Sequence, residues 1–299
     1  MTPSVLGGRG PRVWSRRGLA RLSPADALSV VYELLLHRQP DDAGRASYLP
    51  PLRAGTLSPA QLTEWLVASG EWWNGVTFTE LGASLHFSRT IFVRSLPRAE
   101  HILDLGGTAL GTPVGALVLM GYPYRFERLV VVDLPPADRN ALYREDPNRA
   151  VVESALGPVH YRYHSMTDLS AYPDASFDLV YSGQSIEHVS VADADTVLCE
   201  VARVLRPGGH LALDTPNATV CRLQQAEFID PDHEHEYTHP EMTGKLVAAG
   251  FEVLEAKGLN LSRPGLERGR FSAPEVATAR GLFADVEGCY LLSYLCRLP

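Results

Sequence analysis

Four segments that follow one another in the chain decide the fold: HILDLGG (101–107), RLVVVDLPP (128–136), FDLVYSGQSIEHV (177–189) and VLRPGGHLALDTPN (204–217). Each joins a short apolar run, typical of a buried strand, to a turn. Strands of a parallel sheet are buried on both faces and therefore have nearly continuous apolar sequences. The order of the segments predicts a parallel α/β sheet with a nucleotide-type ligand across the carboxyl edge of its strands.

The remaining pattern from about residue 98 also alternates short strands with helices. We expect strands near residues 101–105, 129–133, 160–164, 177–182, 209–214, 251–256 and 290–297. We expect helices near residues 113–121, 137–145, 191–205 and 239–249, the last two with N-cap residues Ser190 and Thr238. Residues 262–286 are a polar insertion with several glycines and prolines. A substrate lid, an interface arm and an ordinary surface insertion are the three interpretations of this segment.

The first third of the chain has a different pattern. Residues 1–22 contain five arginines, no carboxylate and no long apolar run, and predict a disordered basic leader. Ser23-Pro24 and Ser58-Pro59 are typical helix starts, with a serine cap before a proline. We therefore predict a small all-α domain over residues 23–77 and a connecting helix over 78–97. The α/β domain would occupy residues 98–299.

The glycine turn after the first strand indicates where the ligand binds. Gly106-Gly107 would let backbone amides approach a ligand closely, where a Cβ atom would clash. Asp133 ends the next apolar strand, 29 residues after Asp104, and can accept hydrogen bonds from both hydroxyls of a ribose. A nicotinamide-binding domain would show GxGxxG, whereas this turn reads GGTALG, so that alternative is poorly supported.

Two later blocks, PDASFDLV (173–180) and LRPGG (205–209), complete the pattern. Together with the earlier segments, this run resembles the class I S-adenosylmethionine-dependent methyltransferases. The resemblance implies a Rossmann-like seven-stranded sheet with helices on both faces. It also implies S-adenosyl-L-methionine as cofactor, with S-adenosyl-L-homocysteine as product.

The resemblance also assigns residues to the cofactor. Asp104, Gly106 and Gly107 would line the methionine end, with Thr108 next in the turn, and Asp133 would bind the ribose. Three residues would border the adenine: Leu134, Ser165 and Met166. Gln184 would face the methionine tail or the substrate. The chain departs from the family at Thr108 and Leu110, where glycines are usual, and at Ser165, where an acid is usual.

Methyl transfer to a hydroxyl needs a positioned acceptor and a base, and histidine suits that role. His188 follows the fourth predicted parallel strand and is one candidate base; His233 and His235 are the others. The last two belong to the segment DPDHEHEY (230–237), which has three interpretations. The three are a divalent metal site, an acid/base loop, and a solvated acidic loop anchored by Tyr237. The metal site is the least favoured, and we predict no metal ligands.

Composition excludes several other classes. The net charge is −8, and about −13 without the five leader arginines, which argues against a nucleic-acid substrate. The segment DTPN (214–217) is not the Asn-Pro-Pro-aromatic motif of nucleic-acid amino-methylation. The sequence contains no run of 18 apolar residues, so we expect no segment that spans a membrane. The four cysteines lack CxxC spacing, so we expect buried free thiols and a cytoplasmic protein. Two lysines against 25 arginines indicate the composition bias of a GC-rich bacterium.

The first third also contains the stretches YELLLHRQPDDAGRASYLPPLRAG (32–55) and WLVASGEW (65–72). With them, residues 27–75 resemble a helical domain of unknown function that accompanies bacterial glycosyltransferases. We therefore predict S-adenosylmethionine-dependent O-methylation of a sugar or glycan-linked intermediate, an inference by association. One alternative is a methyltransferase for a small natural product. Another is a non-catalytic binding or dimerisation module whose cofactor site has decayed. A homodimer remains open.

Overall fold

The computed structural model describes residues 19, 21–36, 38–67, 70–109, 112–135, 138 and 149–299. The chain divides into two compact units, Met1–Thr79 and Glu80–Pro299. Most of the predicted basic leader and of the predicted helix at 137–145 lies outside the described residues.

The described part of the first unit is helical. Its helices are α2 (Pro24–Leu36), α3 (Asp42–Ala54), α4 (Pro59–Val67) and the beginning of α5 (Gly70–Arg94). Ser23 Oγ accepts a hydrogen bond from the amide of Asp26, and Ser58 Oγ from the amide of Gln61, as the two serine caps predict. A core of leucines that includes Leu28 and Leu62 holds α2, α3 and α4 together. The predicted domain boundaries stay a prediction.

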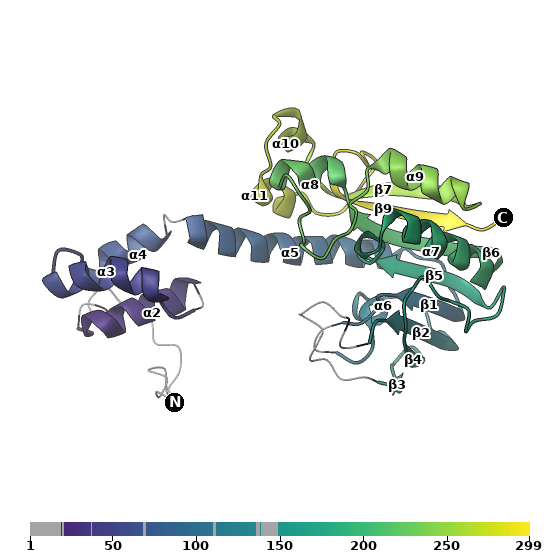
Figure 1. Cartoon of the computed structure of the whole chain (residues 1–299), viewed down its shortest axis with the longest axis horizontal. Helices are drawn as coiled ribbons and strands as arrows, with labels where there is room; N and C mark the ends of the chain where they lie inside the picture. The colour runs from purple at the N-terminus through teal and green to yellow at the C-terminus, as the bar shows by residue number, and fades with distance from the viewer. Residues whose placement is uncertain are drawn as a thin grey trace. The chain divides into compact units, whose positions relative to one another are not determined.

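The second unit contains a mixed sheet, and the prediction of seven strands is wrong: the described residues form nine (Figure 1). The order is β3-β4-β2-β1-β5-β6-β9-β7-β8. Their bounds are β1 (His101–Leu105), β2 (Arg128–Asp133), β3 (Val151–Glu153), β4 (Pro158–Tyr163), β5 (Phe177–Gly183), β6 (Leu205–Pro216), β7 (Glu252–Leu261), β8 (Leu282–Phe283) and β9 (Cys289–Arg297). The extra strands β3 and β8 are antiparallel edges of three and two residues. Such lengths are too short to show a period in sequence.

Helices cover both faces of this sheet. Between α5 and the insertion, the described helices of the second unit are α6 (Ala116–Leu119), the 3-10 turn η2 (Ile186–His188), α7 (Val191–Val204), α8 (Ala218–Gln224) and α9 (His239–Ala248). α7 and α9 pack with Leu103 and Leu105 of β1, whereas α6 and the end of α5 pack with Ile102. Alternate residues of one strand thus enter two cores. No described helix has the length and apolar character needed to cross a membrane.

Helix α6 is shorter than the predicted helix at 113–121. Gly115 and Gly121 flank it with φ values of +81° and +83°. These left-handed conformations favour glycine and end a helix. The predicted N-caps of α7 and α9 are present: Ser190 accepts from the amide of Asp193, and Thr238 from that of Glu241.

The cysteine prediction is wrong at one position. Cys221, Cys289 and Cys296 are buried free thiols, but Cys199 is exposed. α7 buries one face, which contains Val197 and Val201, and Cys199 lies outside that face. A helical position alone therefore did not decide burial.

The insertion at 262–286 is a packed part of the second unit. It contains α10 (Arg263–Glu267), α11 (Ala273–Thr278) and β8. Val276 of α11 is fully buried with Leu81 of α5 and Val220 of α8. Ser84 Oγ of α5 donates a hydrogen bond of 2.7 Å to the carbonyl of Ala277. The insertion therefore joins α5 to β7 through a core of its own.

The burial of Val276 predicts that removal of its two γ-methyl groups destabilises the folded chain. Val276→Ala should lower the free energy of unfolding by about 2 kcal/mol, since a buried methylene contributes about 0.8 kcal/mol and the cavity adds to the loss. Val247→Ala is the matched control, because Val247 is 59% exposed on α9. Denaturant unfolding measures both. Equal effects of the two changes would contradict a packed insertion.

Candidate functional site

The carboxyl ends of five parallel strands bring most of the predicted cofactor residues to one edge of the sheet. Leu105 is paired with Val132, which sets Gly106 next to Asp133. Asp133 is in turn paired with Tyr163 of β4, two residues before Ser165. On the other side, Gly183 of β5 is paired with Asp214 of β6. This edge is where open α/β sheets bind their ligands.

The glycine turn after β1 requires both of its glycines. Gly106 has φ +71°, and a Cβ atom there would lie 2.7 Å from the Cβ of Ser185. A Cβ atom on Gly107 would overlap the carboxylate of Asp104. The turn is fixed by a hydrogen bond of 2.8 Å from the amide of Gly106 to the carbonyl of Val132. The backbone of the turn thus runs close against Asp104 and Ser185.

Two buried polar atoms beside this turn have no hydrogen-bond partner. Asp104 is 1% exposed; its Oδ2 accepts from the amide of Leu117 at 3.4 Å, and its Oδ1 has no partner. Thr108 Oγ1 is also buried and unpartnered. Burial raises the pKa of Asp104 to about 8. Since buried polar atoms are normally paired, both atoms fit a polar ligand in the turn.

The predicted ribose and adenine residues lie at the ends of β2 and β4. Asp133 Oδ1 accepts a hydrogen bond of 2.7 Å from the amide of Leu134, whose side chain is 38% exposed. Ser165 Oγ lies 2.7 Å from Thr167 Oγ1, within its own turn. Met166 packs against the core beneath. The ends of both strands thus place Asp133 and an apolar surface on the same edge.

Gln184 is held by a buried network that the sequence analysis did not predict. Asp214 is fully buried, and its Oδ1 accepts from Arg89 Nε at 2.6 Å and from Gln184 Nε2 at 2.8 Å. Its Oδ2 accepts from the hydroxyl of Tyr181 at 2.6 Å. The side chain expected to face the methionine tail or the substrate is therefore bonded to Asp214. A charged residue inside the apolar strand HLALD (210–214) was the signal that a buried partner exists.

Beyond this network, Glu187, His188 and His233 form a cluster of three side chains, called here the Glu-His-His cluster. One potential ligand atom from each lies within 4.8 Å of the others. Glu187 is fully buried; its Oε2 accepts from Thr215 Oγ1 at 2.9 Å, and its Oε1 has no partner. The two imidazole rings are nearly perpendicular, with centroids 4.8 Å apart. His233 is therefore brought to two residues that lie 45 and 46 positions before it in the chain.

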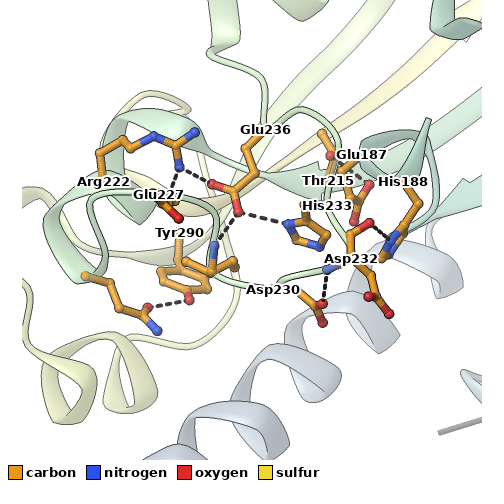
Figure 2. A network of polar contacts seen from close by, with 12 residues as sticks. Glu187, His188, Thr215, Arg222, Glu227, Asp230, Asp232, His233, Glu236 and Tyr290 are labelled. Atoms are coloured by element: carbon orange, nitrogen blue, oxygen red, sulfur yellow. Dashed lines mark hydrogen bonds and ion pairs between the residues drawn. The ribbon is translucent and has the colours of Figure 1, made fainter. Parts of the chain in front are cut away.

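Hydrogen bonds orient both imidazoles. His188 Nδ1 lies 3.0 Å from the carbonyl oxygen of Asp232, and His233 Nδ1 lies 2.8 Å from Glu236 Oε1. Both acceptors require an N–H, so Nδ1 is the donor in each ring. Figure 2 shows Glu236 between Arg222 and His233, with Glu187 and His188 beyond His233. In the neutral rings, the lone pair is then on Nε2.

The structure separates the three predicted histidines. His188 and His233 meet in the cluster, whereas His235 Nε2 lies 3.9 Å from Glu241 and its ring contacts Tyr237. The segment 230–237 is only partly solvated, because His233, Glu236 and Tyr237 are buried. Glu236 accepts hydrogen bonds from Arg222 and from the amide of Ile229, which anchors the segment.

Residues 104–213 match a protein family described as a methyltransferase domain. Over 215 residues the chain is 35% identical to a Mycobacterium tuberculosis protein named a probable S-adenosylmethionine-dependent methyltransferase, and the match covers 70% of this chain and 68% of that protein. The chain belongs to the S-adenosylmethionine-dependent methyltransferases. The expected cofactor pair, S-adenosylmethionine and S-adenosylhomocysteine, is that of this family.

Other relatives match over shorter lengths. A probable S-adenosylmethionine-dependent methyltransferase of Mycolicibacterium smegmatis is 37% identical over 110 residues, 37% of this chain and 42% of that protein. A ubiquinone biosynthesis O-methyltransferase of Xanthomonas euvesicatoria is 32% identical over 126 residues, 38% of this chain and 52% of that protein. This chain thus spans about half the length of these two methyltransferases. A solved S-adenosylmethionine-dependent methyltransferase of Thermotoga maritima shares the fold (TM-score 0.50, 16% identity, 73% of this chain, 91% of that chain).

In this methyltransferase, burial and hydrogen bonds move the pKa values of the Glu-His-His cluster in different directions. Burial raises the pKa of Glu187 to about 7. Loss of solvation lowers the pKa of His188. Burial also opposes charge on His233, but the hydrogen bond to Glu236 and the nearby Glu187 outweigh it and raise the pKa of His233. The environments of the two imidazoles are therefore unlike.

The buried carboxyl of Asp104 predicts a pH dependence of stability without the cofactor. Its pKa is about 8 in the folded chain against 3.8 in the unfolded chain, so the folded state binds more protons between these values. The free energy of unfolding should therefore fall as pH rises from about 4 to 8. Asp104→Asn removes this contribution and should flatten the decline. Thermal unfolding from pH 4 to 9 measures both proteins, and an identical pH dependence would contradict the assignment.

Proposed function

We propose that this methyltransferase transfers a methyl group to a hydroxyl of a sugar or a glycan-linked intermediate. The observation that carries the O-methylation is the Glu-His-His cluster, two of whose residues come shortly after β5, near the residue that touches the glycine turn. Ser185 contacts Gly106, and Glu187 and His188 come two and three residues later. Imidazole and carboxylate groups in this place suit the removal of a hydroxyl proton.

The cofactor side of the site consists of residues at the ends of β1, β2 and β4. Asp104 Oδ1 and Thr108 Oγ1, the two unpartnered atoms, would receive polar groups of the methionine end at the turn. Asp133 would bind the ribose hydroxyls, and Leu134 and Met166 would border the adenine. When bound, S-adenosylmethionine supplies its methyl group as the S–C bond breaks with the electron pair kept by sulfur.

The acceptor side is the Glu-His-His cluster. A hydroxyl oxygen held there forms the new C–O bond, and its proton passes to the cluster and then to water. Relatives named O-methyltransferases, such as the Xanthomonas protein, support oxygen as the acceptor atom. The sugar rests on the resemblance of residues 27–75 to the helical domain found beside bacterial glycosyltransferases, which is an association and not a geometric argument.

Asp133→Ala should abolish measurable binding of S-adenosylmethionine by calorimetric titration, because two hydrogen bonds from the ribose lose their acceptor. Asp174→Ala is the matched control: Asp174 precedes β5 at the opposite edge and forms only an exposed ion pair with Arg203. The control should bind as the wild type does. Unchanged binding by the Asp133 variant would remove the proposed ribose site, and no binding by the wild type would favour the decayed module.

The acceptor class is tested with a labelled methyl donor and a panel of free sugars, nucleotide sugars, phenols and carboxylic acids. We expect the label in a sugar, in a product that resists alkali, because an ether resists alkali and a methyl ester does not. Label confined to phenols would favour a small natural product as the substrate. Label only in an alkali-sensitive product would contradict transfer to a hydroxyl.

On the best acceptor, His188→Ala and His233→Ala should each lower kcat by about 10²–10⁴-fold, the usual contribution of acid–base catalysis. Titration should show that both still bind S-adenosylmethionine as the wild type does. His235→Ala is the control on the same segment as His233, since its imidazole points to Glu241. Equal kcat values in all three variants would exclude the cluster from the reaction.

A further inference from the structure

We infer that the Glu-His-His cluster is a binding site for a divalent transition-metal ion. The inference rests on the proposed function only for the role of the ion, which would polarise the acceptor hydroxyl. The ligands would be one carboxylate and two imidazoles, from Glu187, His188 and His233. From the sequence we predict no metal ligands, and the metal alternative concerns the segment 230–237 alone. The structure instead joins one residue of that segment to two from the end of β5.

Both imidazoles are already oriented as metal ligands are. Metal-binding histidines usually donate the N–H of one ring nitrogen to a carbonyl or carboxylate, which fixes the tautomer and leaves the other nitrogen for the ion. His188 Nδ1 donates to the carbonyl of Asp232, and His233 Nδ1 donates to Glu236. Glu236 is itself held by Arg222 at 2.6 Å. The supporting residues of a metal site are therefore in place for both rings.

The carboxylate of Glu187 supplies an independent observation. Glu187 is 0% exposed, and its Oε1 has no hydrogen-bond partner although Oε2 accepts from Thr215. An unpartnered buried carboxyl oxygen costs free energy, and native proteins rarely keep one without a use. A cation between Glu187 and the two imidazoles would satisfy this oxygen. Asp230 and Asp232, close in the same segment, add negative charge that favours a cation.

The backbone holds the two segments of the site together. The amides of Glu234 and His235 donate to the carbonyl of Glu187, at 2.8 and 3.1 Å. The three ligand atoms lie within 4.8 Å of one another, whereas tetrahedral zinc needs about 3.3 Å between ligand atoms at its usual bond lengths of about 2.0–2.1 Å. Binding of an ion would therefore bring the ligand atoms closer together by up to about 1.5 Å. The backbone hydrogen bonds between the two segments leave this adjustment to the side chains.

The donor set selects the kind of ion. Two imidazole nitrogens and one carboxylate oxygen suit zinc and similar first-row ions, whereas magnesium and calcium prefer all-oxygen sites. Three protein ligands leave a coordination position open, as catalytic metal sites do. With the ion bound, both Nε2 lone pairs are ligands, so an acceptor hydroxyl in that position, made a stronger acid by the ion, would lose its proton directly to water.

The test is a zinc titration of the full chain by calorimetry after removal of metals with a chelator. All proteins carry Cys199→Ser, because this thiol is exposed and could bind zinc by itself. We expect one zinc ion per chain, and magnesium binding at least about 100-fold weaker. Glu187→Gln, His188→Ala and His233→Ala should each weaken zinc binding by at least about 10–100-fold, the loss seen when even an outer supporting residue is removed. His235→Ala is the matched control and should bind zinc as the parent does.

Several results would overturn the site. These are the absence of stoichiometric zinc binding, and equal binding by the parent and the three ligand variants. His188→Ala keeps the test decisive if a buried variant fails to fold, because His188 is exposed and its variant can be checked by S-adenosylmethionine titration. Methyl transfer without zinc binding would remove the metal site and leave the proposed function. Zinc binding by the cluster without methyl transfer to any hydroxyl would support the metal site and contradict the proposed function.

Discussion

The site depends on one buried carboxylate, that of Asp214 at the end of β6. A buried charge without partners is strongly unfavourable, so its three donors must stay where they are. Arg89 ties the end of α5 to the sheet, and Tyr181 ties the neighbouring strand β5. Gln184 is held at φ +57°, a conformation that few residues other than glycine adopt, by its side-chain and backbone bonds to Asp214. This bend turns the chain from β5 into the segment that contains Ser185, Glu187 and His188.

The next residue of the same strand fixes the other side of the site. Successive side chains of a strand point to opposite faces, and Thr215 donates to Glu187 while Asp214 binds Gln184. Between them, Ser185 is bonded to Ser182 through its hydroxyl and touches Gly106. The glycine turn and the Glu-His-His cluster are therefore positioned by one strand end. A change at Asp214 would disturb both the cofactor side and the acceptor side.

The parts of the fold that the sequence predicted have local signals. Apolar runs located the seven long strands, and serine or threonine caps located the starts of α2, α4, α7 and α9. β3, β8 and the packing of the insertion depend on partners distant in sequence, and short segments have no period to detect. Val276, for example, is buried in a cluster that includes Leu81 and Val220, both distant from it in the chain.

The same division applies to the candidate site. Gly106 and Asp133 could be identified because a turn after a strand and an acid at the end of the next strand are local patterns. The pairing of His188 with His233, and the absence of His235 from it, follow from how two loops meet, which a linear pattern does not contain. In the sequence, Asp214 and Thr215 are only the end of an apolar segment, and nothing local indicates which residues they bind. Their importance depends on Arg89, which is 125 positions from Asp214 in the chain.

The two unpartnered carboxyl oxygens lower the stability of the folded chain when no ligand is bound. Asp104 Oδ1 lies beside the glycine turn and Glu187 Oε1 lies in the Glu-His-His cluster, and burial raises the pKa of both groups. Hydrogen bonds inside the protein could have satisfied either oxygen, as they do for Asp214. One unpartnered carboxyl oxygen lies on the cofactor side of the contact between Gly106 and Ser185, and the other lies on the acceptor side. Each side is therefore most stable when a ligand occupies it. Ligands that bind only the folded state then stabilise it, so the same two atoms couple recognition on both sides to the stability of the domain.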